Sequence, residues 1–181
     1  MKFFSTFLLA CALAVPAFAQ DAKTNSTDAD VQSPGQFFPA SAAVLTAPLV
    51  LTNDAISLNG DMAEVTNGGT AVFTFTITNA GNYVFETLVN APDESSNSFF
   101  VNVDDQPEDP DMIWDVDVTM GFQKRLLNWR GNGDSTTDQF TPKRFTLTAG
   151  EHKLIIIGRE PNTQLKSLTI RPAPPQAPAT P

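Results

Sequence analysis

The sequence is poor in the side chains that most catalytic and metal centres need. It contains one cysteine, Cys11, and one histidine, His152. This scarcity excludes a multi-histidine zinc site and leaves no basis for a Cys–His catalytic pair. The motifs G-x-S-x-G, H-E-x-x-H, G-x-G-x-x-G and the P-loop are also absent. A glycosidase needs only two carboxylates, but none of the 20 acidic residues stands out as a pair. We therefore predict that the protein is not an enzyme.

Long hydrophobic runs are also missing, because the longest, Phe3 to Val15, falls short of the roughly 18 residues that span a bilayer. That run follows Lys2 and precedes Ala17-Phe18-Ala19, which is the pattern of a cleavable signal peptide over residues 1–19. We expect an exported protein, periplasmic or extracellular, without a transmembrane segment. Cys11 lies inside the leader, so the mature chain is predicted to lack thiol chemistry. A lipid anchor on Cys11, after Leu8-Leu9-Ala10, is the less favoured alternative.

Positive charge is scarce as well. Eleven Lys and Arg residues stand against 20 Asp and Glu residues, which gives a formal net charge of -9. An acidic surface repels phosphate backbones, so this composition disfavours a nucleic-acid partner.

Composition divides the chain into four parts. Residues 1–19 form the predicted signal peptide, and residues 20–43, rich in Asp, Ser, Thr, Ala and Pro, are predicted to be a flexible linker in which Phe37-Phe38 could dock on the domain. Residues 44–171 carry the strand pattern described next. Residues 172–181 form a Pro/Ala-rich tail with few backbone donors.

The central region alternates with a period of two. In residues 72–78, Phe73, Phe75 and Ile77 face one side and threonines face the other, which predicts a half-buried strand. Asn79-Ala-Gly-Asn82 is a turn sequence, so residues 83–89 are expected to complete a hairpin. About ten short strands can be outlined in this way, including 44–51 and 62–65. Such a chain is typical of an all-β fold, an antiparallel β-sandwich or jelly roll.

Several motifs recur in an order found in one group of proteins. They are Gly81-Asn-Tyr83, Val89-Asn-Ala-Pro92, Asn97-Ser-Phe-Phe-Val-Asn-Val-Asp104, Thr146-Leu-Thr-Ala-Gly-Glu-His152 and Ile157-Gly-Arg-Glu160. Over residues 48–171 the chain thereby resembles the galactose-binding-like jelly rolls of bacterial carbohydrate-binding modules. Lys166 departs from the pattern, since that group usually has Asp there. The resemblance implies the fold, a structural role for His152, and a polysaccharide or glycan ligand at a loop edge of the sandwich.

Such a ligand site needs flat aromatic faces that stack on sugar C–H groups, and polar side chains that bind hydroxyls. The candidate ligand-binding residues are Trp129, Trp114, Asn97, Arg159 and Asn162. Each has a structural alternative. Either tryptophan could fill the core, Asn97 could cap a turn, and Arg159 could tie down the turn that follows it. Because neighbouring strand residues face opposite sides, Arg159 and Glu160 are not expected to pair with each other.

The metal prediction concerns one acidic run. No cofactor is predicted. The carboxylates of the acidic run Asp104–Asp111 could nevertheless bind a structural calcium ion. Its spacing lacks the D-x-[DN]-x-[DN]-G pattern. The main functional hypothesis is thus an exported, non-catalytic glycan-binding module. The alternative is a structural or protein-interaction module of the cell envelope or surface without a sugar site.

Overall fold

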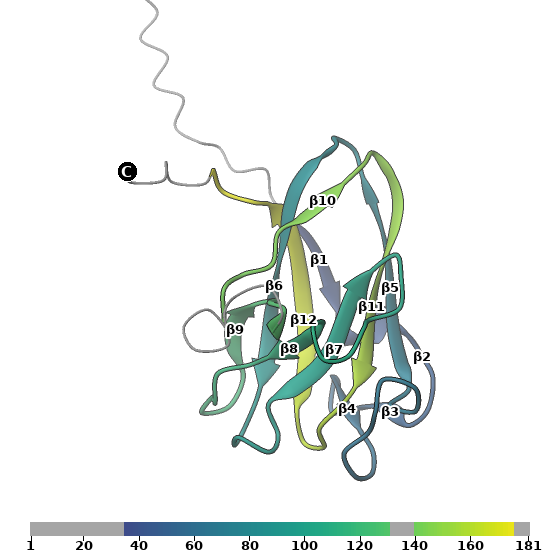
Figure 1. Ribbon diagram of the computed structural model, residues 1–181, viewed down its shortest axis with the longest axis vertical. Coiled ribbons are helices and arrows are strands. Elements are labelled where there is room, and N and C mark those ends of the chain that lie inside the picture. Colours follow the sequence, from purple (N-terminus) through teal and green to yellow (C-terminus); the bar gives the residue numbers. More distant parts are fainter. Residues whose placement is uncertain (1–34, 131–139, 176–181) are drawn as a thin grey trace, which may run out of the picture. The chain divides into compact units, whose positions relative to one another are not determined.

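A computed structural model describes residues 35–130 and 140–175 of the chain. The predicted signal peptide, Cys11 and the linker as far as residue 34 lie outside the described residues. Within these ranges the strands pair antiparallel in two sheets, which form the predicted sandwich (Figure 1). No described helix is long and apolar enough to cross a membrane.

One sheet has seven strands among the described residues, in the order β10-β6-β12-β4-β3, with β9 beside β6 and β1 beside β12. Its strands are β1 (Gln36–Pro39), β3 (Leu49–Thr52), β4 (Ala55–Leu58), β6 (Gly81–Asn90), β9 (Gln123–Leu126), β10 (Phe145–Leu147) and β12 (Gln164–Pro172). The other has five, in the order β2-β5-β11-β7-β8. They are β2 (Val44–Leu45), β5 (Thr70–Ile77), β7 (Ser98–Val103), β8 (Ile113–Asp115) and β11 (Gly150–Gly158). A short 3-10 turn, η1 (Ala40–Ala42), follows β1.

The main core lies between the sheets and follows from the period-two pattern. Phe73, Phe75 and Ile77 of β5 are buried, whereas the threonines at 74 and 76 are exposed, as predicted. Phe75 meets Phe85 of β6 edge-on, with 5.8 Å between ring centroids. Alternating apolar residues on facing strands thus close the two sheets onto one another.

Strand β7 is buried along its whole length, because a second apolar layer covers the outer face of the five-stranded sheet. Phe99 points into the main core, and Phe100 into a smaller cluster of buried residues. That cluster also contains Ile113, Ile155 and Ile157, with Val65 packed against it. The loop carrying Val65 crosses the sheet closely, since a Cβ on Gly68 would lie 1.8 Å from a backbone oxygen of Gly158. This loop and the strands it covers support the face that carries the candidate site.

The structure corrects the predicted domain boundaries. Residues 36–43 were expected in the linker, yet β1 pairs with β12 in register Gln36↔Ile170, and Phe38 contacts Phe73 in the core. The expected tail also starts too early, since β12 runs to Pro172 and the Ala173 amide donates to the Asn82 carbonyl oxygen. Both errors have one cause: pairing with a distant strand gives order to short segments that lack a periodic pattern of their own.

The predicted hairpin of residues 72–78 with 83–89 was wrong, because β5 and β6 follow each other in the chain but face each other from different sheets. Two predicted strands were also wrong in detail. Residues 44–51 form β2 and β3, which belong to different sheets, and Pro48 lies between them. Proline lacks the amide hydrogen that continues a ladder, so the chain changes sheet there. Residues 62–65 form no strand and instead belong to the loop over the five-stranded sheet.

The resemblance implies a structural role for His152. In the structure each of its ring nitrogens lies close to a hydrogen-bond acceptor. Its Nδ1 is 2.7 Å from Oδ2 of Asp104, and its Nε2 is 2.9 Å from the carbonyl oxygen of Thr148. Both ring nitrogens can satisfy these partners only by donating, which requires the imidazolium. The hydrogen bond to Asp104, more than any other contact, raises the pKa of His152 above 6.5.

Protein stability should therefore fall with rising pH through the titration of His152. The stability that the imidazolium contributes is present in full below about pH 6.5 and is lost as pH rises through the higher pKa of the folded state. NMR titration of the ring should give that pKa directly. Urea unfolding between pH 5 and 9 should show a smaller pH dependence for His152→Gln than for the wild type. A ring that titrates below 6.5 would contradict this expectation.

Candidate functional site

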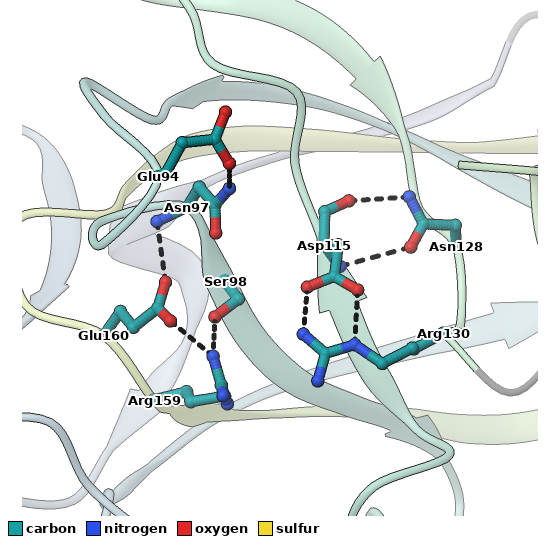
Figure 2. A network of polar contacts seen from close by, with 8 residues as sticks. All are labelled: Glu94, Asn97, Ser98, Asp115, Asn128, Arg130, Arg159 and Glu160. Atoms are coloured by element: carbon teal, nitrogen blue, oxygen red, sulfur yellow. Dashed lines mark hydrogen bonds and ion pairs between the residues drawn. The ribbon is translucent and has the colours of Figure 1, made fainter. Parts of the chain in front are cut away.

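The pairing of β7 with β8 places two polar residues side by side. Ser98 lies opposite Asp115 in the register of this pair, one residue pair beyond Phe99↔Trp114. Cross-strand partners project from the same face of a sheet. Ser98 and Asp115 are both buried. The side chain of each accepts hydrogen bonds from an arginine. These two arginines begin the polar cluster drawn in Figure 2.

Asp115 is held by the segment that follows β9. Arg130 donates two hydrogen bonds to its carboxylate, Nε to Oδ2 at 2.7 Å and Nη2 to Oδ1 at 2.6 Å. The Asn128 side chain bonds both backbone groups of Asp115, accepting from its amide at 3.2 Å and donating to its carbonyl at 2.7 Å. Asn128 thereby replaces a neighbouring strand at the free edge of β8. The hydrogen bonds between Arg130 and the Asp115 carboxylate raise the pKa of Arg130 above its usual value, so the guanidinium stays charged.

The second arginine comes from the loop between β11 and β12. Nη1 of Arg159 donates to Oγ of Ser98 at 2.6 Å and to Oε1 of Glu160. The other carboxylate oxygen of Glu160 accepts the backbone amide of Asn97 at 2.9 Å. The Asn97 side chain donates to Glu94 at 3.3 Å. The loops after β6 and β11 lie at the same end of the sandwich (Figure 1), and these contacts join them.

We call this cluster the edge network. It consists of Glu94, Asn97, Ser98, Asp115, Asn128, Arg130, Arg159 and Glu160. Figure 2 shows its two halves on either side of the β7–β8 pair. Ser98, Asp115, Asn128 and Glu160 are buried, Glu94 is exposed, and Asn97 and the two arginines are partly buried, with Arg159 the less exposed arginine. Buried partners thus fix the orientation of the polar groups that solvent can reach.

One expectation about this cluster was wrong. Arg159 and Glu160 do pair with each other, although neighbours on a strand face opposite sides. The physical reason is that β11 ends at Gly158. Both residues therefore lie beyond the strand, where side chains no longer alternate.

Trp114 cannot be an exposed ligand contact. Its indole is 0% exposed and stacks on Phe99 with 5.7 Å between centroids. Trp114 and Asp115 are consecutive in β8, so the indole points between the sheets while the carboxylate points to the outer face. Of the two alternatives for Trp114, the core is the one that the structure adopts.

Trp129 is half-buried and is engaged on several sides. Its Nε1 donates to the carbonyl oxygen of Val101 at 2.9 Å, and its ring meets Phe145 edge-on. Nζ of Lys143 lies 3.9 Å from the ring centroid, so a cation covers one face. A sugar could stack on that face only if Lys143 moved. Neither tryptophan therefore presents the open platform that the sequence suggested.

Asn97 and Arg159, by contrast, are brought together in the edge network. Asn162 lies nearby in the chain, on the exposed turn after Glu160, with a left-handed φ of 63°. Asparagine tolerates this conformation better than most residues, which gives the side chain a local structural explanation.

A shallow groove of about 230 Å³ adjoins the edge network and shares Asp115 and Asn128 with it. Asp117, Lys124, Arg125 and Phe140 line the rest of it, together with the short apolar residues Val116, Leu126 and Pro142. Phe140 is 44% exposed. The groove combines donors, acceptors and one accessible aromatic ring, which are the groups that sugar recognition needs.

The described residues show no group of three or more His, Cys, Asp or Glu side chains that could hold a metal ion. In the acidic run considered for calcium, Asp104 is committed to His152 and to the amide of Lys153 at 2.9 Å.

Sequence inspection missed Asp115, Asn128, Arg130 and Phe140. For Asp115 a signal existed, because alternation through Ile113-Trp114-Asp115 places aspartate and indole on opposite faces. Asn128 and Arg130 flank Trp129 and thus share one face, but only the fold shows that this face meets β8.

The two-sheet architecture and the strand order define a jelly-roll sandwich of the type found in carbohydrate-binding modules. The structure is similar to family 35 carbohydrate-binding modules: it matches the mannan binding module from Man5C with a TM-score of 0.51 and 17% identity, over 77% of this chain and 99% of the module. It matches a family 35 carbohydrate binding module from Clostridium thermocellum with a TM-score of 0.51 and 14% identity, over 75% and 98% of the two chains.

A third similar structure is a GH26-CBM35 β-(1,4)-mannanase from Podospora anserina, with a TM-score of 0.53 and 12% identity over 80% of this chain. This chain spans 29% of that enzyme's length, whereas it spans nearly all of the two modules. At these identities the similarity establishes the fold. No protein-family model matches the sequence, and no curated protein matches it.

Proposed function

We propose that this protein is an exported, non-catalytic module that binds a polysaccharide or glycan at the loop edge of the sandwich. The observation that carries the proposal is the edge network, in which buried carboxylates hold Arg130 and Asn97 at the surface of one edge and the mostly buried Arg159 beside them. Sugar hydroxyls both donate and accept hydrogen bonds, so a surface with both kinds of group suits them. Because buried partners fix these side chains, little conformational entropy is lost when a ligand binds.

The adjoining groove supplies the apolar contact. Its volume of about 230 Å³ is below the roughly 300–1,000 Å³ of enclosed ligand pockets. An open subsite of this kind suits a chain that continues past the protein better than a small ligand held inside it. One similar structure is described as a mannan binding module, and another belongs to a β-(1,4)-mannanase. Mannan is thus the first glycan to test.

One observation favours the alternative, a structural or protein-interaction module of the envelope or cell surface. Trp114 is in the core and Lys143 covers one face of Trp129, so the usual stacking platform is absent from the described residues. The glycan proposal therefore depends on hydrogen bonds at the edge network and on Phe140.

Calorimetric titration of the protein with mannan and other soluble polysaccharides, with and without calcium, tests the proposal. Asn97→Ala should weaken binding about 2- to 10-fold, the worth of one neutral hydrogen bond. Its side chain bonds only the exposed Glu94 among the described residues, so the fold should persist. The matched control is Asn79→Ala, an exposed turn asparagine at the opposite end of β6. Export would be recognised by a mature N-terminus at Gln20.

Two outcomes would count against glycan binding at this edge. In one, no polysaccharide in the panel gives a saturable titration. In the other, binding occurs but the Asn97 and Asn79 variants bind as the wild type does. The first outcome would shift the interpretation to the interaction module.

A further inference from the structure

A second groove, separate from the edge network, lies on the outer face of the seven-stranded sheet. Its volume is about 470 Å³. Val84 of β6, Leu126 of β9 and Arg171 of β12 line it, and Arg144 and Pro174 add the segments before β10 and after β12. It shares no residue with the edge network, although Leu126 and Pro142 also line the smaller groove beside that network.

The groove carries positive charge that the described residues do not balance. Arg144 makes one hydrogen bond in the described part of the chain, from Nη1 to the carbonyl oxygen of Pro174 at 2.7 Å. Arg171 lies 3.8 Å from Glu86, but Glu86 is bound more closely by Lys124, at 2.6 Å. One carboxylate thus faces two cations, and Arg144 has no carboxylate partner among the described residues.

This arrangement is unusual for the chain as a whole. The protein has a net charge of -9, yet no Asp or Glu is among the residues that line this groove. Arginine presents a planar fork of N–H donors that matches a carboxylate or sulfate group. Most of these donors on Arg144 and Arg171 have no hydrogen-bond partner in residues 35–130 and 140–175.

We propose that this groove binds the carboxylate or sulfate groups of an acidic polysaccharide. The two arginines would take the anionic group, and the Thr141 hydroxyl would bind a neighbouring oxygen. Val84, Leu126 and the prolines of the groove would contact the C–H faces of the sugar ring. The groove is too large for a single ion, and its apolar walls suit a saccharide. This site goes beyond the glycan contact proposed for the edge network and does not depend on it.

Three polymers with one backbone test the charge requirement: dextran, carboxymethyl-dextran and dextran sulfate. Titrations of the whole protein at low and high salt should show saturable binding of one or both charged polymers, weakened by salt, and none of dextran. Arg144→Gln and Arg171→Gln should each weaken that binding about tenfold or more, because each removes a charged hydrogen-bond donor. Whichever charged polymer binds identifies the anionic group.

The control is Lys153→Gln, which removes one positive charge from an exposed side chain of β11 in the other sheet. Arg171→Lys keeps the charge but loses the planar fork, and should bind more weakly than the wild type. Urea unfolding of each variant separates loss of binding from loss of folding.

The proposal is wrong if neither charged polymer binds, if dextran binds equally, or if Lys153→Gln weakens binding as much as the groove variants do. Mannan binding that Arg144→Gln and Arg171→Gln leave unchanged would report on the edge network, so the two proposals can fail separately.

Discussion

Replacing Trp114 with alanine is expected to lower the free energy of unfolding by about 3–5 kcal/mol. The indole is fully buried, and it stacks on Phe99 in the main core. Removing it leaves a cavity that the surrounding strands can fill only in part. Because small domains have only about 5–15 kcal/mol of net stability, a loss of this size should shift the urea midpoint strongly. Far-UV circular dichroism and Trp129 fluorescence can follow the transition.

Trp114→Phe is the matched control. The Nε1 group of Trp114 is buried and has no hydrogen-bond partner in the described structure. Phenylalanine keeps much of the apolar volume and removes this unsatisfied donor, which itself costs about 1–3 kcal/mol. The phenylalanine variant should therefore be clearly more stable than the alanine variant. If Trp114→Ala folded as stably as the wild type but lost glycan binding, the indole would be a ligand contact after all.

Trp114 also shows which features of the structure can be predicted from the sequence and which cannot. The alternation of Phe73, Phe75 and Ile77 correctly predicted β5, because that pattern depends on local geometry. The predicted hairpin with β6 is wrong, since β5 and β6 belong to different sheets. The same rule indicates that Trp114 and its neighbour face opposite sides, but it does not say which side is the core. That choice depends on the register Phe99↔Trp114 between two strands that are separated by a loop.

Segments without a pattern were harder to place. β1 has four residues, and its order comes from β12, more than 120 residues later in the chain. Nothing within Gln36–Pro39 signals this partner. The polar site shows the same limit: Asn97 and Arg159 were candidates, and the structure joins them through Ser98 and Glu160. Long-range pairing, which no short window of sequence contains, determined both results.

Arg130 gives the second large effect that we expect. Arg130→Met should cost about 3 kcal/mol of stability, at the lower end of the roughly 3–5 kcal/mol measured when one partner of a buried ion pair is removed. The loss arises because Asp115, which is 2% exposed, would keep a buried charge without its cation. The side chain of Arg130 is 37% exposed, so water could reach part of the space it leaves. Because water can enter this space, we expect the loss of stability to lie at the lower end of that range.

The pH dependence of the variant identifies the cause. Without Arg130, the buried Asp115 carboxylate has no cation beside it, and acid removes this uncompensated charge. The gap between variant and wild type in urea unfolding should therefore narrow as pH falls. Adding Asp115→Asn to Arg130→Met should recover part of the loss, since no charge then remains buried.

Arg125→Met provides the control, because its partner Asp117 is exposed and 3.8 Å away, and losing such a pair costs about 0–1 kcal/mol. If both arginine variants lost the same stability at every pH, the Asp115 charge would not be the cause, and the edge network would lose the buried anchor on which its proposed binding depends.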